Sequence, residues 1–217
     1  GIFGLLTIIF FVKEAKKSKG TLPKKIAFKD FSTKYYEFLW IAFIFTLGNS
    51  TDALLLLKAN DIGIKALFIP IVYLIFNSVS VIFAVPMGIL SDKFDRERII
   101  IFGYLLYSVI YLGFGRTTNK ILVILLFALY GLYSAATDGV QKALVSDLID
   151  KNKRGTGLGI YNALIGITLL PASLIAGVLY DKVNNSAPFY LGSAIALIAA
   201  ILMLLFYKKF SIFKNIL

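Results

Sequence analysis

Six long apolar stretches constrain this chain more than any other feature. They lie at about 36–57, 65–87, 99–115, 120–145, 156–179 and 188–207. A helix needs about 20 apolar residues to cross the hydrocarbon core of a bilayer, and only helices and closed barrels satisfy their own backbone groups there. The runs are continuous rather than alternating, which favours helices over barrel strands. The sequence therefore predicts an all-α membrane protein, with a bundle of six transmembrane helices over 36–207.

The composition supports this class and narrows the chemistry. Hydrophobic residues make up 59% of the chain and charged residues 16%, whereas about 25% is usual for the charged residues of soluble domains. The chain has neither cysteine nor histidine, so we expect no metal site and no cofactor, and any proton chemistry is expected to use Asp or Glu. The net charge is +11. In a membrane protein, the informative property is where the charges lie relative to the spans, and we expect no nucleic-acid partner.

Lysine and arginine residues are distributed unevenly between the two sets of loops. Seventeen of the 23 lie in 13–35, in 93–98, in 151–154 and in the tail, against five in the alternate loops, and Lys142 lies within a span. This excess predicts that the first set is cytoplasmic. Both ends of the six-helix unit then face the cytoplasm, in a multi-pass protein of the plasma (inner) membrane.

The ends of the chain are assigned from length and charge. Residues 1–12 are apolar but too short to span, so we interpret them as the end of a truncated preceding transmembrane helix. The segment 13–35 is predicted to be a basic cytoplasmic linker, and 208–217 a cytoplasmic tail. Such charge runs are also typical of solvated segments that only set the orientation.

A weak repeat relates the two halves of the bundle. GILSDK at 88–93 recurs as GVLYDK at 177–182, and the Ser-Thr-Asp that ends at Asp52 recurs as the Ala-Thr-Asp that ends at Asp138. The offsets are close to three spans, and three spans reverse the direction of crossing. The pattern predicts two inverted three-helix repeats, a construction common in secondary transporters.

Charged residues inside the spans are the first candidates for a functional site. Insertion scales give a cost of about 2.5–3.5 kcal/mol for a charge at mid-bilayer, and such residues are usually functional. Asp138 and Lys142 are four residues apart and can pair, although Lys142 can also extend to the interface. Asp52 is a second candidate, with an interfacial charge or a cap at the outer helix end as the alternative. By helical rise the two acids differ in depth by about 16 Å and are not expected to touch.

Polar side chains near these charges complete the predicted substrate and coupling set. Interhelical hydrogen bonding or packing is the alternative for each of them, as it is for Tyr130, Tyr133 and Tyr161, which are candidates for a cavity wall. The added residues are Asn49, Asn77, Gln141 and Asn162.

The loop sequence GILSDKFDRERII (88–100) carries the most specific pattern. Gly88 is expected to let another helix approach closely, and Asp92 to lie just past a helix end, near the N-terminus of a neighbouring helix. Lys93, Arg96 and Arg98 are expected to hold the loop on the cytoplasmic side. A plain charged turn that stops transfer is the alternative.

The same string resembles the loop signature of the major facilitator superfamily, Gly-x-Leu-x-Asp-(Arg/Lys)-x-Gly-Arg-(Arg/Lys). Asp95 and Glu97 depart from that pattern. LVSDL (144–148) with RGTGLG (154–159), and LLPAS (169–173) with Ala176-Gly177, resemble the tenth and eleventh helices of bacterial members. The matching loop positions are Gly88, Leu90, Asp92, Lys93 and Arg96.

The resemblance implies a fold and a role. The six spans would form the C-terminal half of a twelve-helix fold, and the loop a conformational latch of Gly88, Asp92, Lys93, Arg96 and Arg98. The chain is then expected to be part of a secondary active transporter that moves a small solute by alternating access, with the proton as candidate coupling ion. Its expected partners are a missing N-terminal six-helix half, the solute and the lipid bilayer.

Two other classes remain open. One is a non-transporting membrane scaffold or receptor. The other is an intramembrane enzyme, because Tyr180-Asp181 resembles half of an aspartyl protease signature; however, the sequence holds no Gly-x-Gly-Asp partner. We therefore expect no enzyme.

Overall fold

The computed structural model describes residues 31–214, with side chains as far as 209. Helices joined by short connections make up this part of the chain, which contains no strand. Six segments are long and apolar enough to cross a membrane, the first of them formed by two helices in succession. The elements are α2 (Thr33–Gly48), α3 (Asp52–Asp61), η2 (Ala66–Phe68), α4 (Ile69–Lys93), α5 (Arg96–Arg116), α6 (Lys120–Asp147), η3 (Lys151–Lys153), α7 (Arg154–Lys182) and α8 (Ala187–Lys214).

The predicted domain boundaries are only partly within this range. The expected helix end at 1–12 and most of the linker at 13–35 lie outside the described residues. The first described helix, α2, begins at Thr33, and the last, α8, ends at Lys214. Parts of the predicted linker and of the predicted tail are therefore helical.

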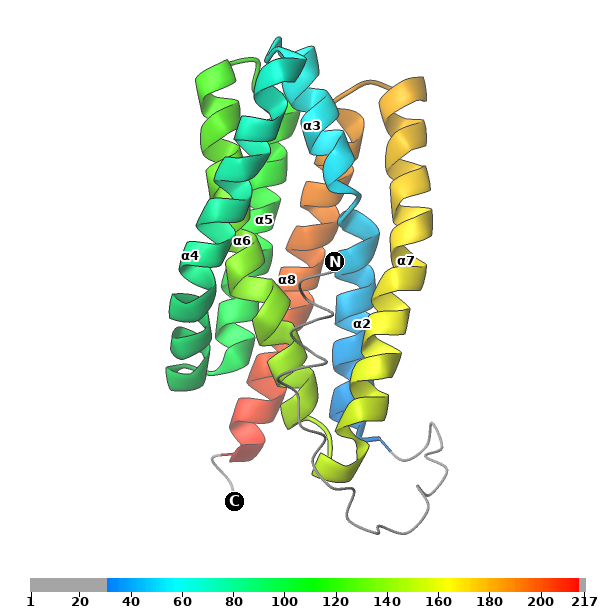
Figure 1. Ribbon diagram of the computed structural model, residues 1–217. Helices are drawn as coiled ribbons and strands as arrows, with labels where there is room; N and C mark the ends of the chain where they lie inside the picture. Colours follow the sequence, from blue (N-terminus) through cyan, green and yellow to red (C-terminus); the bar gives the residue numbers. More distant parts are fainter. Residues whose placement is uncertain (1–30, 215–217) are drawn as a thin grey trace, which may run out of the picture. The chain divides into compact units, whose positions relative to one another are not determined.

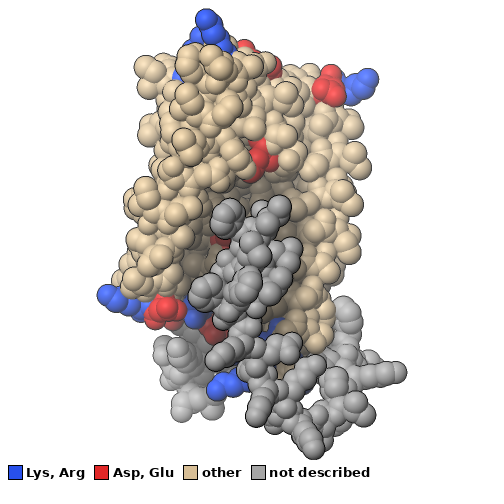
Figure 2. Space-filling view, in the orientation of Figure 1, with Lys and Arg blue, Asp and Glu red and all other residues tan. Residues whose placement is uncertain are grey.

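The helices form an up-and-down bundle whose short connections lie at two ends (Figure 1). We call the end with residues 94–95 and 148–153 the motif end, because it carries the loop described above. The opposite end carries residues 62–65, 117–119 and 183–186. Charged residues gather at both ends, and the length between them is covered by uncharged residues apart from a few acidic atoms (Figure 2). This distribution agrees with a bundle that crosses a membrane.

The contacts between helices support the inverted repeat. α4 packs on α6 as α7 packs on α2, and α6 packs on α5 as α2 packs on α8, while α5 and α8 pack on each other. If each of the first three spans is exchanged for the corresponding span of the last three, the same pairs of neighbouring helices result. α4 and α7 stand at the two sides of the bundle in Figure 1 and are largely exposed.

Aromatic rings from α2, α5 and α6 fill the interior. Tyr104, Tyr107 and Tyr111 of α5 are fully buried, and the ring of Tyr104 stacks on Phe45 with centroids 3.9 Å apart. Close packing of α4 on α6 occurs at Gly131, where a Cβ would lie 2.4 Å from the carbonyl oxygen of Phe76. The hydrophobic side chains alone would not have identified this contact.

The first span differs from the single helix predicted at 36–57. It is broken between Gly48 and Asp52. The N–H of Asn49 donates to the carbonyls of the preceding turn and ends α2, while the Thr51 side chain accepts the N–H of Ala53 and begins α3. Tyr107 donates its hydroxyl to the freed carbonyl of Gly48 at 3.0 Å. The break is stable because side chains replace the helical bonds.

Candidate functional site

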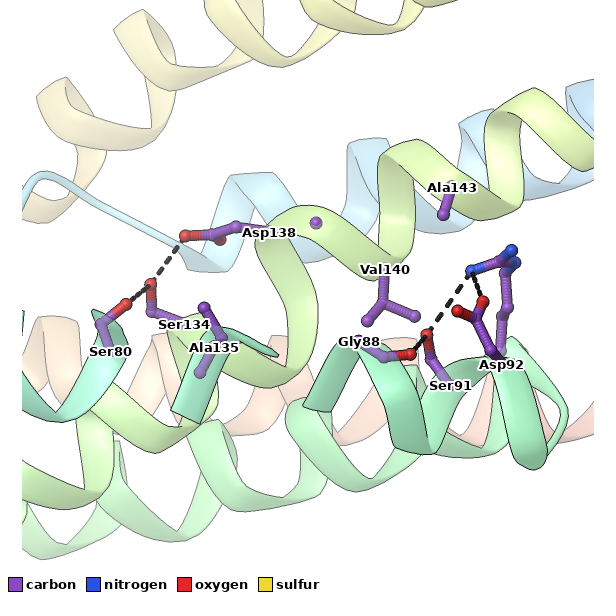
Figure 3. A pocket seen from close by; sticks show the side chains of 12 residues that line it. Ser80, Gly88, Ser91, Asp92, Ser134, Ala135, Asp138, Val140 and Ala143 are labelled. Atoms are coloured by element: carbon purple, nitrogen blue, oxygen red, sulfur yellow. Dashed lines mark hydrogen bonds and ion pairs between the residues drawn. The ribbon is translucent and has the colours of Figure 1, made fainter. Parts of the chain in front are cut away.

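Asp138 lies on α6 and faces the space beside α4. Its Oδ2 accepts a hydrogen bond from Ser134 Oγ, one turn earlier, at 2.6 Å. Ser134 Oγ lies 3.1 Å from Ser80 Oγ of α4, and either hydroxyl can donate. Figure 3 shows the resulting chain from Ser80 through Ser134 to Asp138. A carboxylate and two hydroxyls thus connect the two helices.

Two hollows meet at Asp138. The first, of about 390 Å³, lies between α4 and α6 and continues toward the motif end; Ser80, Gly88, Ser91, Asp92 and Arg96 are among its lining residues. The second, of about 360 Å³, is bounded by α2, α6 and α7. Asp138 lines both and is exposed in the described chain. Among the described residues, it is the only one that lines both hollows.

The second hollow brings together five of the seven residues predicted for the substrate and coupling set. Gln141 accepts a hydrogen bond from Tyr161 Oη at 2.7 Å, and Asn49 Nδ2 donates to Tyr133 Oη at 3.3 Å. The sequence separates these residues widely, and the packing of α2 and α7 against α6 brings them together. The five are Asn49, Asp138, Gln141, Lys142 and Asn162.

The pairing of Asp138 with Lys142 that the spacing allowed is not formed. Both side chains line the second hollow, but they are not among the ion pairs of the described residues. Ser134 is the hydrogen-bond partner of Asp138 instead.

Asn77 lies apart from these residues. Its amide donates to the carbonyl of Tyr73, one turn earlier in α4, at 2.8 Å. It lines neither hollow at Asp138.

Asp52 occupies a separate position above the break in the first span. It is the first residue of α3 and is half-buried. Tyr130 Oη of α6 donates to its Oδ1 at 2.8 Å, and Tyr73 Oη of α4 donates to its Oδ2 at 3.5 Å. No bond joins the described carboxylates of Asp52 and Asp138, as their expected difference in depth predicted.

At the motif end, Arg96 is the centre of a charged network. Its guanidinium contacts Asp92 at 3.1 Å and Asp147, at the end of α6, at 2.5 Å. It also lies 3.5 Å from Ser91 Oγ. The network therefore joins the end of α4, the start of α5 and the end of α6. Asp147 was not among the predicted site residues, although it lies in LVSDL (144–148), one of the stretches that resemble the superfamily.

Two details of the loop prediction were wrong. Asp92 lies within the last turn of α4, rather than past its end, and its ion-pair partner is Arg96, the first residue of α5 after the turn. Gly88 is not a point of close helix approach, since nothing in the described chain lies within 4 Å of a Cβ placed there. Gly88 instead lines the first hollow, and its carbonyl accepts the hydroxyl of Ser91.

Arg98 forms a second link, to α8. Its Nε donates to Tyr207 Oη at 2.8 Å, and that hydroxyl donates to Asp95 at 2.9 Å. Arg98 and Asp95 also pair at 3.3 Å. Lys93 is exposed and takes part in none of the ion pairs found between described residues.

Comparison with known proteins assigns the chain to a family. The profile of the Major Facilitator Superfamily matches residues 38–211, which include five of the six spans in full and most of the first. The chain belongs to the major facilitator superfamily. The resemblance predicted from the loop at 88–100 is thereby confirmed, and so is the prediction of an all-α membrane fold with six spans.

The superfamily relatives include both uncharacterized and drug-resistance proteins. An uncharacterized MFS-type transporter of Methanocaldococcus jannaschii is 38% identical over 94% of this chain and 53% of its own length. Multidrug resistance protein 3 of Bacillus subtilis is 24% identical over 60% of this chain and 26% of its own. The class H tetracycline resistance protein of Pasteurella multocida is 27% identical over 62% and 33%. The chain thus spans about half the length of the first of these relatives, and less of the others is covered.

Proposed function

We propose that this chain is part of a secondary active transporter that moves a small solute across the membrane by alternating access, with protons as the coupling ion. The observation that carries the proposal is the position of Asp138, which lines two hollows on either side of α6. A titratable group shared by two hollows can respond to the occupant of either one. Membership of a superfamily whose named relatives include transporters supports the same conclusion.

The hydroxyl chain suggests how Asp138 couples to helix packing. When Asp138 is ionised, Ser134 donates to it, and Ser80 is free to donate to Ser134. When Asp138 is protonated, its own hydroxyl can donate to Ser134, and Ser134 then donates to Ser80. The direction of the hydrogen bonds between α4 and α6 reverses with the proton. Protonation thereby biases the packing of the helix pair that borders the first hollow.

The solute is proposed to bind in the second hollow, against a second six-helix half. Asn49, Gln141, Lys142 and Asn162 offer donors and acceptors there. The largely exposed apolar lengths of α4 and α7 are proposed to contact that half and the lipid bilayer. Charged residues at both ends suit a membrane-spanning orientation, with the motif end in the cytoplasm.

The network at the motif end is proposed to act as the latch that the superfamily resemblance implies. Arg96 joins Asp92 to Asp147 and closes the same hollow that Asp138 lines. Arg98 adds the link through Tyr207 to α8. The latch would hold the ends of α4, α6 and α8 together in one conformer and release them in the other.

Transport by the whole native protein in proteoliposomes tests this function. Uptake of candidate solutes is measured with and without an imposed proton gradient, for the wild type and for Asp138→Asn. We expect that Asp138→Asn abolishes the response to the gradient, because its amide cannot take up a proton, while exchange of solute without a gradient persists. Asp181→Asn is the matched control, because Asp181 lies at the end of α7 that is away from the motif end. This variant should behave as the wild type.

Two results would contradict the proposal. An unchanged gradient response in Asp138→Asn would remove this residue from coupling. No movement of any solute by the wild type would favour a scaffold or receptor. Superfamily membership points away from the intramembrane enzyme, and Tyr180 is hydrogen-bonded to Asp61 of α3.

A further inference from the structure

Asp52 has no role in the coupling just proposed, and its surroundings differ from those of Asp138. It is the first residue of α3, is half-buried, and is hydrogen-bonded to side chains of α4 and α6. Its two described partners are tyrosine hydroxyls, from Tyr130 and Tyr73. Both partners are neutral hydroxyls, so neither brings a positive charge to this carboxylate within the apolar length of the bundle.

No base neutralises this charge in the described part of the chain. None of its ion pairs includes Asp52. Lys58, on the same helix, is buried and donates to Asn185 and Ser186 at the opposite end. Lys142 is twelve residues from Tyr130 along α6, which is about 18 Å by helical rise. A charged acid within a span is costly, and such residues usually pair with an opposite charge or face the protein interior or water.

The two tyrosines that bond the carboxylate are linked through the ring of Phe76. The ring centroids of Tyr73 and Phe76 are 5.3 Å apart, and those of Phe76 and Tyr130 are 5.1 Å apart. We call these three residues the aromatic ledge. Within the aromatic ledge, the side chains of Phe76 and Tyr130 are buried and that of Tyr73 is exposed. In Figure 2, acidic atoms appear midway between the ends, among uncharged residues.

A carboxylate held beside the exposed ring of Tyr73 favours one ligand chemistry. The carboxylate attracts positive charge, and the ring faces attract it further through their quadrupoles. The rings also offer apolar area to the body of the ligand. A small inorganic cation would gain little from the rings, and an anion would be repelled by Asp52.

We propose that Asp52 and the aromatic ledge bind a lipophilic organic cation, and that this cation is the class of solute the protein transports. The transport of this cation rests on the proposed function, whereas its binding does not. Asp52 is assigned to the ligand's positive charge and Asp138 to the proton. The two repeats then supply one acid each, with different tasks.

Two ions of the same shape and opposite charge test this inference. Binding of tetraphenylphosphonium and tetraphenylborate to the whole native protein in detergent is measured by equilibrium dialysis, corrected with protein-free micelles. We expect tetraphenylphosphonium to bind the wild type and tetraphenylborate to bind no more than to micelles. Asp52→Asn should weaken tetraphenylphosphonium about tenfold, a loss of about 1.4 kcal/mol, and Asp52→Glu should keep most of the affinity.

A matched variant separates a local effect from a general change of charge. Asp61 lies at the other end of α3, where it accepts hydrogen bonds from Tyr180 and Asn185. Asp61→Asn removes the same charge from the same helix and should leave the affinity within twofold of the wild type. Tyr73→Leu removes an exposed ring and should weaken binding several-fold. Thermal unfolding of each variant checks that it folds.

The outcomes distinguish this inference from the proposed function. Equal binding of both ions, or unchanged tetraphenylphosphonium affinity in folded Asp52→Asn, overturns the organic-cation site. Flux of tetraphenylphosphonium in proteoliposomes is measured in parallel. Binding that depends on Asp52 without any flux would support the site and contradict the transport function. Flux of another solute without tetraphenylphosphonium binding would support the transport function and contradict the organic-cation site.

Discussion

Asp52 and Asp138 occupy equivalent places in the two repeats, but the helices that carry them differ. The first span is broken just before Asp52, whereas α6 runs without interruption past Asp138. Asp52 is held by tyrosines from two neighbouring helices, and Asp138 by a serine of its own helix. The comparison teaches that a repeat conserves position, while the surrounding contacts decide what an acid at that position can do.

The largest effect is expected where the unbroken helix packs most closely. In Gly131→Ala, the new Cβ would lie 2.4 Å from the carbonyl oxygen of Phe76 and 2.9 Å from Val79 Cβ, so α4 and α6 must separate. We expect a loss of about 3 kcal/mol in the free energy of unfolding, measured by thermal unfolding in detergent. Gly139→Ala on the same helix meets nothing within 4 Å in the described chain.

Gly139→Ala should therefore be neutral, or more stable by up to about 1 kcal/mol through helix propensity. Equal destabilisation by both substitutions would show that α6 is sensitive to any change and that the close approach at Gly131 is not special.

An intermediate effect is expected at the break in the first span. Tyr107→Phe removes the hydroxyl that donates to the carbonyl of Gly48. That carbonyl has left its helical partner, so we expect a loss of about 2 kcal/mol in the free energy of unfolding. The measurement is again thermal unfolding.

Tyr104→Phe is the matched control for Tyr107→Phe. Both tyrosines are fully buried on α5, but the hydroxyl of Tyr104 has no hydrogen-bond partner among the described residues. Its removal should leave stability unchanged or raised. If Tyr104→Phe were as destabilising as Tyr107→Phe, the hydroxyl of Tyr107 would not be what stabilises the break.

The smallest effect is expected at the caps that begin the two acid-bearing helices. The Asn119 side chain accepts the N–H groups of Ile121 at 2.8 Å and Leu122 at 3.3 Å, whereas the Thr51 side chain accepts that of Ala53 at 3.4 Å. Asn119→Ala should cost about 1 kcal/mol in the free energy of unfolding, and Thr51→Ala less, because its bond is longer. If thermal unfolding showed Thr51→Ala to be more destabilising than Asn119→Ala, the break in the first span would depend on the Thr51 cap.

Much of the fold could be predicted from the sequence. Each apolar run is long enough to span and identifies its own helix, and the paired GxLxDK strings indicated the inverted repeat that the contact scheme supports. The break at Asn49 was not predicted, although Gly48-Asn49-Ser50-Thr51 interrupts the apolar run with residues that favour turns and helix caps. Nothing in the sequence near Gly48 shows that Tyr107, nearly sixty residues later, will bond its carbonyl.

The candidate site was predicted less completely. Charge inside a span indicated Asp52, Asp138 and Lys142, and the structure brings Asp138 and Lys142 into one hollow with three of the predicted polar residues. Asn77 lies elsewhere, and the spacing of Asp138 and Lys142 did not lead to an ion pair. The link from Arg96 to Asp147 joins residues 51 positions apart, which local spacing cannot indicate.

The sequence by itself determined that the chain crosses a membrane six times, which loops carry its basic residues, and which acids lie within its spans. Those properties follow from apolar length and charge, and both are local. Only the tertiary structure decided which partner each acid has, where the first span breaks, and which hollows meet at Asp138. These depend on side chains from helices that are distant in sequence, and close packing at points such as Gly131 sets which of them meet.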